Sequence, residues 1–139
     1  RGEGSWEKGA EAVRAFLKTA VGAEDVTITD GSGLARDNRA SPETIVKLLN
    51  LMRTHRSGKA FVDSLAVAGE TGTLDDRMKS IAGRVRAKTG TISGVSTLSG
   101  YAETASGETL VFSILVNGWK GGSPRNLQDR ICEILVKGK

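Results

Sequence analysis

A short string of residues, Lys88-Thr89-Gly90-Thr91, combines a cation, two hydroxyls and a glycine within a stretch that alternates like a β-strand. Lys88 supplies a fixed positive charge for an anionic substrate, and the hydroxyl of Thr89 can donate to a carboxylate. Gly90 lets a substrate backbone approach closely because it has no side chain. The backbone N–H of Thr91 can donate to an oxyanion that develops during a reaction. The string therefore predicts a strand that borders a cleft and binds a substrate by β-augmentation.

The tripeptide Lys88-Thr89-Gly90 is weak evidence on its own. An exposed lysine on a strand edge commonly protects against edge-to-edge aggregation, and this simpler explanation needs no ligand. The surrounding sequence has to decide between a protected edge and a binding strand.

Other side chains that could carry chemistry are few. His55 is the only histidine and lies in a polar stretch at an expected helix end, where a cation favours the helix dipole. Cys132 is the only cysteine, so it forms no internal disulfide, and we expect a buried, inert thiol. One histidine and one cysteine do not make a metal centre, so we expect no bound metal.

The bulk composition describes an ordinary globular chain. Its 139 residues suffice for one domain with a core, and 38% are hydrophobic and 26% charged. The net charge of +4 is mixed along the chain, and no aromatic residues interleave the densest basic stretch, 77–88, so we expect no nucleic-acid partner. No apolar run is long enough to span a bilayer. Because residue 1 is arginine rather than methionine, we expect a processed product or a fragment.

Apolar periodicity predicts helices before and after the motif strand. The first covers 8–21, the second begins at Ser41-Pro42-Glu43 and ends at Ser57-Gly58, and the last opens at Pro124. Their expected inward residues are Val13, Phe16, Leu17 and Ala20 in the first helix, Ile45, Leu48, Leu49 and Met52 in the second, and Leu127, Ile131, Ile134 and Leu135 in the last.

Alternating residues predict three main strands, at 84–92, 95–103 and 109–117, with a hairpin turn at 105–108. We expect a short strand at 26–29, an irregular segment at 61–72 and a short helix at 74–81. The order of these elements predicts an α+β fold, in which helices pack on an antiparallel sheet.

Several sequence blocks, in this order and spacing, resemble one known family. They are Asp30-Gly31-Ser32-Gly33-Leu34 with Arg36-Asp37-Asn38, then Ser64-Leu65-Ala66-Val67-Ala68-Gly69, Gly72-Thr73-Leu74, Arg84 to Thr91, and Leu98-Ser99-Gly100-Tyr101. Together they resemble the C-terminal part of penicillin-binding D-alanyl-D-alanine carboxypeptidases and endopeptidases, the class C low-molecular-mass penicillin-binding proteins of peptidase family S13. The resemblance covers nearly the whole chain, and the combined blocks are highly specific.

The resemblance implies the serine β-lactamase/DD-peptidase fold, a five-stranded antiparallel sheet flanked by helices. It implies a serine in a Ser-x-x-Lys motif that is acylated by peptidoglycan stem peptides ending in D-Ala-D-Ala, or by β-lactam antibiotics that mimic them. Lys88, Thr89, Gly90 and Thr91 then bind the substrate carboxylate and complete the oxyanion hole, and Ile92 lines the pocket. No organic cofactor or metal is implied, and the location is periplasmic or extracellular.

The block around Asp30 has two interpretations. Its glycines and Asp30 can simply build a turn. Alternatively, Arg36 faces the cleft and contacts the substrate peptide.

The nucleophile motif expected from the resemblance is absent from this chain. No Ser-x-Asn string is present, and the single Ser-x-x-Lys string, Ser5 to Lys8, falls in a different block, so we expect Ser5 to cap a helix instead. Residues 1–139 are then the C-terminal portion of the transpeptidase-like domain and are inactive alone. With three strong strands where the family has five, we expect the missing part or a second copy to cover the sheet edge.

Two other functions remain open from the sequence. One is a β-lactamase of the same superfamily, against which the blocks 30–34 and 64–69 argue. The other is a non-catalytic module that uses Lys88-Thr89-Gly90 to hold peptidoglycan peptides.

Overall fold

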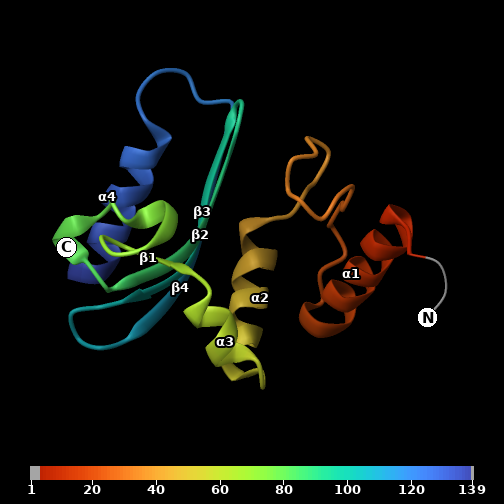
Figure 1. Ribbon diagram of the computed structural model, residues 1–139, viewed down its shortest axis with the longest axis horizontal. Coiled ribbons are helices and arrows are strands. Elements are labelled where there is room, and N and C mark those ends of the chain that lie inside the picture. The colour runs from red at the N-terminus through yellow and green to blue at the C-terminus, as the bar shows by residue number, and fades with distance from the viewer. Residues whose placement is uncertain (1–3, 139) are drawn as a thin grey trace.

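The computed structural model describes residues 4–138, so Arg1 lies outside the described range. A four-stranded antiparallel sheet in the order β1-β2-β3-β4 lies between two layers of helices (Figure 1). The strands are β1 (Ala66–Val67), β2 (Val85–Ile92), β3 (Val95–Glu103) and β4 (Thr109–Asn117), and the helices are α1 (Trp6–Val21), α2 (Pro42–Thr54), α3 (Gly58–Asp63) and α4 (Pro124–Lys137). Helix α4 covers one sheet face, α2 and α3 cover the other, and α1 packs on the outer side of α2 (Figure 1). The predicted α+β fold is confirmed.

Strand β2 is paired very differently on its two sides. It pairs with β3 along its whole length, from Val85 opposite Ala102 to Ile92 opposite Val95. On its other side, β1 reaches only Arg86 and Ala87. Within residues 4–138, the edge of β2 beyond Ala87 therefore has no strand partner.

The main core fills the space between the sheet and α4. Its fully buried members include Leu98 on β3 and Cys132 on α4, both 0% exposed. Burial raises the pKa of the Cys132 thiol to about 12, as befits the inert cysteine that the sequence predicts. A second core lies between the sheet and α2, where the hydroxyl of Tyr101 donates to the carbonyl of Leu49 at 2.7 Å. These two cores anchor the central strands on both faces.

Serine caps fix where the long helices begin. The hydroxyls of Ser5, Ser41 and Ser123 accept hydrogen bonds from backbone N–H groups of the first turns of α1, α2 and α4. Pro42 and Pro124 occupy the first turn, where a missing N–H costs nothing. The predicted starts of α2 and α4 are confirmed, as are both predicted boundaries of β3 and β4.

The predicted end of α2 is wrong. The helix ends at Thr54, because His55 leaves the helical conformation with a ψ of 148°. Gly58 starts α3 instead, and a Cβ on it would lie 2.2 Å from the carbonyl oxygen of Met52. Glycine is therefore required there by the close approach of α3 to α2.

Other local predictions also fail. The segment 61–72, expected to be irregular, contains the end of α3 and strand β1. The expected helix at 74–81 is instead two 3-10 turns, Gly72–Leu74 and Lys79–Ile81, because Met78 between them is left-handed with a φ of 56°. The strand expected at 26–29 is only a single bridge, between Thr27 and Arg39.

Two predicted helix faces need correction. In α1, Leu17 is buried but Val13 and Phe16 are 45% and 49% exposed, because α1 packs through the face of Leu17 against α2 and the segment 23–40. In α4, Leu127 and Ile134 are 53% and 44% exposed. The residues that α4 buries are Gln128, Cys132 and Val136, at a spacing of four residues.

Substituting one leucine on β3, beneath α4, and one on the outer face of α4 tests this core assignment. We expect Leu98→Ala to lower the free energy of unfolding by about 2–5 kcal/mol, because it leaves a cavity in a closed core. The matched change Leu127→Ala should cost less than about 1 kcal/mol, because that side chain is half exposed. Urea denaturation measures both, and equal losses would contradict the orientation of α4.

Candidate functional site

The motif Lys88-Thr89-Gly90-Thr91 lies on the second half of β2 and lines an open depression of about 780 Å³. The depression is also lined by residues from other segments of the chain. These are Ser32, Gly33 and Leu34 from the loop after Asp30, Thr73 and Arg77 from the segment before β2, Ile92 and Thr97 from the β2–β3 hairpin, and Arg125 from α4. Segments far apart in the sequence thus converge on the motif strand.

Side chains of the motif point to both faces of the sheet. Thr89 and Thr91 lie on the α4 face, and Lys88 and Gly90 lie on the opposite face, because side chains alternate along a strand. The hydroxyl of Thr89 donates to that of Thr73 at 2.9 Å, and the ammonium of Lys88 donates to the carbonyl of Thr89 at 2.5 Å. The first contact ties the motif to the Gly72-Thr73-Leu74 block.

The glycine of the motif has a steric reason. A Cβ on Gly90 would lie 2.5 Å from the hydroxyl oxygen of Thr97, its partner across the β2–β3 ladder. Any larger residue would displace Thr97, which lines the same depression. Glycine at this position therefore leaves the strand surface free of side-chain atoms beside Thr97.

The free edge of β2 presents the backbone groups of Thr89 and Thr91. The carbonyl of Val85 accepts from the N–H of Ala68 at 2.9 Å, which shows that Val85 directs its backbone toward the β1 side. Backbone groups alternate in direction along an antiparallel strand. Thr89 and Thr91 therefore direct their N–H and C=O groups toward the same side, where no strand pairs with them in the described part of the chain. This edge can accept an added strand.

The loop beside the motif is organised by one carboxylate. Asp30 accepts hydrogen bonds from the Ser32 hydroxyl at 2.5 Å, from the side-chain amide of Asn38 at 2.6 Å, and from the backbone N–H groups of residues 33–35. These donors, with Ser32 the largest contributor and Asn38 next, lower the pKa of Asp30 to about 2. The block thus forms the turn that the first interpretation predicted. Asn38 also serves this turn, by accepting from the N–H of Thr29 at 2.7 Å.

Arg36 lies outside the motif depression. It lines an adjacent depression of about 680 Å³, whose wall also includes Asn38 and Leu115. Ile92, Gly33 and Thr97 line both depressions, so the two adjoin. The structure therefore brings Ile92 together with Lys88 to Thr91 in one depression, and places Arg36 in the adjacent depression.

The Ser-x-x-Lys string has a structural role. Ser5 caps α1 by accepting from the N–H of Lys8 at 3.2 Å, as predicted. Helix α1 is separated from the sheet by α2 (Figure 1), and Ser5 does not line the motif depression. His55 likewise serves a helix end, since it caps α2 and its Nδ1 accepts from the N–H of Ser57 at 3.1 Å.

Sequence reasoning missed several residues of the depression. Arg125 adds a guanidinium group to the charge of Lys88, which favours an anionic ligand, whereas the guanidinium of Arg77 is paired with the carboxylate of Asp129 at 2.6 Å. Thr73 and Leu34 also line it, and both belong to blocks that the sequence had singled out. Arg77 and Arg125 lie in segments without a motif, so only their place in the fold reveals them.

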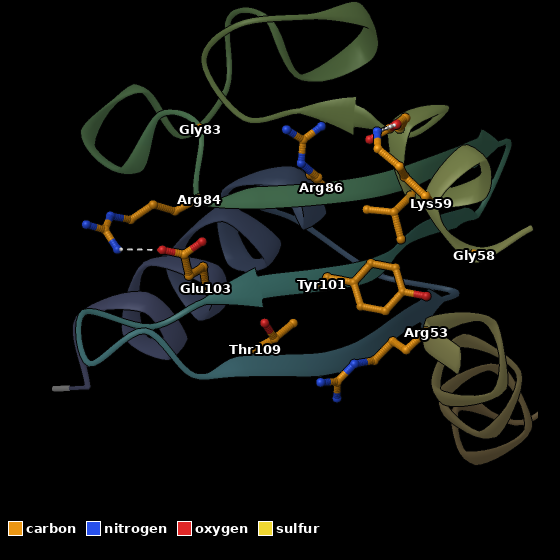
Figure 2. Close-up of a pocket in the computed structure, with 11 residues that line it drawn as sticks. Arg53, Gly58, Lys59, Gly83, Arg84, Arg86, Tyr101, Glu103 and Thr109 are labelled. Atoms are coloured by element: carbon orange, nitrogen blue, oxygen red, sulfur yellow. Dashed lines mark hydrogen bonds and ion pairs between the residues drawn. The ribbon is translucent and has the colours of Figure 1, made fainter. Parts of the chain in front are cut away.

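A separate depression of about 460 Å³ lies at the other end of β2 (Figure 2). Its charged side chains partly neutralise one another, since Arg84 is 3.7 Å from Glu103 and Lys59 pairs with Asp63. None of the motif residues line it. Across residues 4–138, no group of three or more His, Cys, Asp or Glu side chains could hold a metal, and no helix is both long and apolar enough to cross a bilayer.

The chain matches known proteins over nearly its whole length. The family model described as D-Ala-D-Ala carboxypeptidase 3 (S13) matches residues 1–137. The chain is 42% identical over 144 residues to a D-alanyl-D-alanine carboxypeptidase of Actinomadura sp. (strain R39), covering 98% of this chain and 27% of that protein.

Solved structures show the same fold. Penicillin-binding protein 4 from Haemophilus influenzae, in complex with a novel β-lactam, superposes with a TM-score of 0.79 at 28% identity, over 91% of this chain and 33% of that one. A predatory endopeptidase from Bdellovibrio bacteriovorus, acylated by penicillin G, gives 0.76 at 25% identity, over 94% and 39%. The chain thus spans less than half the length of these relatives.

Removing the Ser32 hydroxyl tests the Asp30 turn. We expect Ser32→Ala to raise the pKa of Asp30 from about 2 toward 3.8. Because the folded pKa is lowered, the stabilisation from ionised Asp30 is fully present above pH 3.8 and is lost as the pH falls through about 2. A carboxyl ¹³C NMR titration measures this, with Ser106→Ala as a control that should change nothing. An Asp30 midpoint near 3.8 in the unchanged chain would contradict the hydrogen-bonded turn.

Proposed function

This chain belongs to the D-Ala-D-Ala carboxypeptidase 3 (S13) family, and we propose that it is the substrate-binding part of a serine-type D-Ala-D-Ala carboxypeptidase/endopeptidase. The observation that carries the proposal is the free edge of β2 at Lys88 to Thr91, which borders a cationic depression. The substrates are peptidoglycan stem peptides, which lie outside the cytoplasmic membrane. The parent protein therefore acts in the periplasm or outside the cell.

The geometry suggests how a stem peptide binds. Its C-terminal segment adds to the free edge of β2 as an extra strand and exchanges hydrogen bonds with Thr89 and Thr91. Lys88 and the hydroxyl of Thr89 bind the terminal carboxylate, with Arg125 raising the local positive potential. Ile92 contacts the peptide at the boundary of the two depressions, and Arg36 contacts its more distant residues in the adjacent one.

The reaction needs a nucleophile from outside this chain. A serine of the parent protein attacks the carbonyl of the penultimate D-Ala, the terminal D-Ala leaves as an amine, and water then cleaves the acyl-enzyme. The N–H of Thr91 stabilises the oxyanion of both tetrahedral intermediates. Since Ser5 is committed to capping α1, the isolated chain should be inactive.

The outer edge of β4 offers a place for the rest of the parent protein. Within the described residues, β4 pairs only with β3, so its other edge is unpaired along Thr109–Asn117. An exposed edge of this length and apolar character tends to pair with another strand. We expect the missing part of the parent to pair there, and a second copy to take its place when the chain is alone.

Labelling with a fluorescent penicillin tests the reaction class. The chain alone and the parent protein with its upstream part restored are each treated, and intact mass is measured. We expect an adduct only on the restored protein. An adduct on the chain alone would mean that Ser5 is the nucleophile, rapid loss of the adduct would indicate a β-lactamase, and no adduct on either would favour a non-catalytic binding module.

The role of Lys88 is tested in the restored protein. We expect Lys88→Ala to reduce the second-order rate of penicillin acylation by about 100-fold, because a charge aimed at the carboxylate and the reacting centre is lost. Lys120→Ala, in the loop before α4 and outside the depression, is the matched control. A Lys88→Ala protein that is acylated at the unmodified rate would exclude Lys88 from the site.

The state of the β4 edge is tested by light scattering on the isolated chain. We expect a mass above the 14.6 kDa of one copy, because strand pairing hides the unpaired backbone groups. A folded species of 14.6 kDa at micromolar concentration would contradict pairing at this edge.

A further inference from the structure

A glutamine occupies a fully buried position on α4. Gln128 is 0% exposed, whereas the adjacent Leu127, which helical periodicity places inside, is 53% exposed. Burying an amide costs free energy unless its polar atoms find hydrogen-bond partners. The inward position of Gln128 therefore has to be explained by its polar contacts, because a leucine would fill an apolar site more favourably.

Both ends of the Gln128 amide are hydrogen-bonded. Its Oε1 accepts from Nη2 of Arg77 at 3.1 Å, and its Nε2 donates to the hydroxyl of Ser96 at 3.1 Å. A guanidinium is only a donor, so it fixes the orientation of the amide and directs Nε2 toward Ser96. Ser96 is itself only 2% exposed. The glutamine thus connects the segment before β2 to strand β3.

Arg77 is held rigidly at the other end. Its Nε and Nη2 donate to Oδ1 of Asp129 at 3.0 and 2.6 Å. The side chains of Arg77 and Asp129 are only 15% and 24% exposed. Two contacts from a planar guanidinium restrict it far more than one would. Arg77 also lines the motif depression, so the hydrogen-bonded set of Arg77, Gln128 and Ser96 extends to the site.

The set approaches the motif from two sides. Ser96 is the cross-strand partner of Thr91, whose N–H lies on the free edge. The segment that carries Arg77 also carries Thr73, which accepts from the hydroxyl of Thr89. A displacement of Gln128 would therefore be transmitted to Thr91 through β3 and to Thr89 through the segment 72–81.

We infer that Arg77 and Gln128 are positioning residues that hold Thr89 and Thr91 in register for the substrate carboxylate and the oxyanion. The inference rests on the proposed function, which it deepens. Buried polar networks are seldom more stable than apolar packing of equal volume, but fully satisfied networks specify one geometry. Burying Gln128 while Leu127 stays exposed lowers the stability of the fold but fixes the geometry of the site. A positioning role explains this arrangement.

The test uses two variants of the restored parent protein. Gln128→Leu replaces the amide by an apolar side chain of similar size, and Ser96→Ala removes only the β3 contact. We expect both to lower the second-order rate of penicillin acylation by roughly 10- to 100-fold, because small misplacements of a reacting group are costly. The matched control is Ser80→Ala, which removes another hydrogen bond between this segment and α4, to Glu133 at 2.7 Å, away from the motif.

Thermal unfolding is measured on the same samples. A slower rate in the folded variants, with the rate of Ser80→Ala unchanged, supports positioning. Variants that unfold at lower temperature but are acylated at the unmodified rate would show a structural role alone and would overturn the inference. If Gln128→Leu does not fold, Ser96→Ala decides.

A second arm uses the isolated chain and needs no catalysis. Amide hydrogen exchange and ¹⁵N chemical shifts report the environment of Thr89 and Thr91 directly. We expect Gln128→Leu to shift both amides and Ser80→Ala to shift neither. If the restored parent is not acylated at all, the proposed function fails, but the measurement on the isolated chain still decides the inference. Unchanged amide shifts and exchange rates of Thr89 and Thr91 in Gln128→Leu would overturn the inference.

Discussion

The unequal pairing of β2 is the constraint on which the rest of the structure depends. One edge of the strand is hydrogen-bonded to β3 throughout, and the other is released after Ala87 because β1 is only two residues long. Pairing begins with Ala66 opposite Ala87, so no residue of β1 reaches Lys88, and it closes at the other end, where the N–H and carbonyl of Ala68 bond to Val85 and Gly83. What remains is a row of backbone donors and acceptors that neighbouring segments border but do not pair.

An unpaired edge is useful only if the strand does not move. Strand β2 is held by β3 in its plane and by the α4 core below it, where Val85, Ala87 and Leu98 are fully buried. The loop around Asp30 and the segment 72–81 form the walls of the depression. Hydrogen bonds order both walls, those to Asp30 in the loop and that from Thr89 to Thr73 in the segment 72–81.

Sequence reasoning succeeded where one physical signal dominates. Alternation placed β3 and β4 at their observed boundaries, serine followed by proline placed the start of α2, and Pro124 placed that of α4. The motif strand and the blocks around Asp30 and Thr73 were also identified, and the fold brings them together. In these cases local chemistry and the tertiary structure favour the same outcome.

It failed where tertiary contacts outweigh local pattern. Gly58 was read as a helix stop, but it is a packing residue against Met52. Leu127 was expected inside, but the polar partners of Gln128 rotate α4 so that the glutamine is buried instead. Arg77 and Arg125 could not be assigned to the site because nothing in their sequence neighbourhood reveals which depression they line.

The most direct measurement is a titration of the isotopically labelled chain, followed by NMR, with a peptide that ends in D-Ala-D-Ala. If the free edge of β2 binds the substrate, the amides of Thr89 and Thr91 shift together with those of Lys88 and Ile92, and a peptide ending in L-Ala-L-Ala shifts them much less. Shifts confined to the depression of Figure 2, around Arg86 and Tyr101, or equal shifts with both peptides, would contradict a substrate-binding edge.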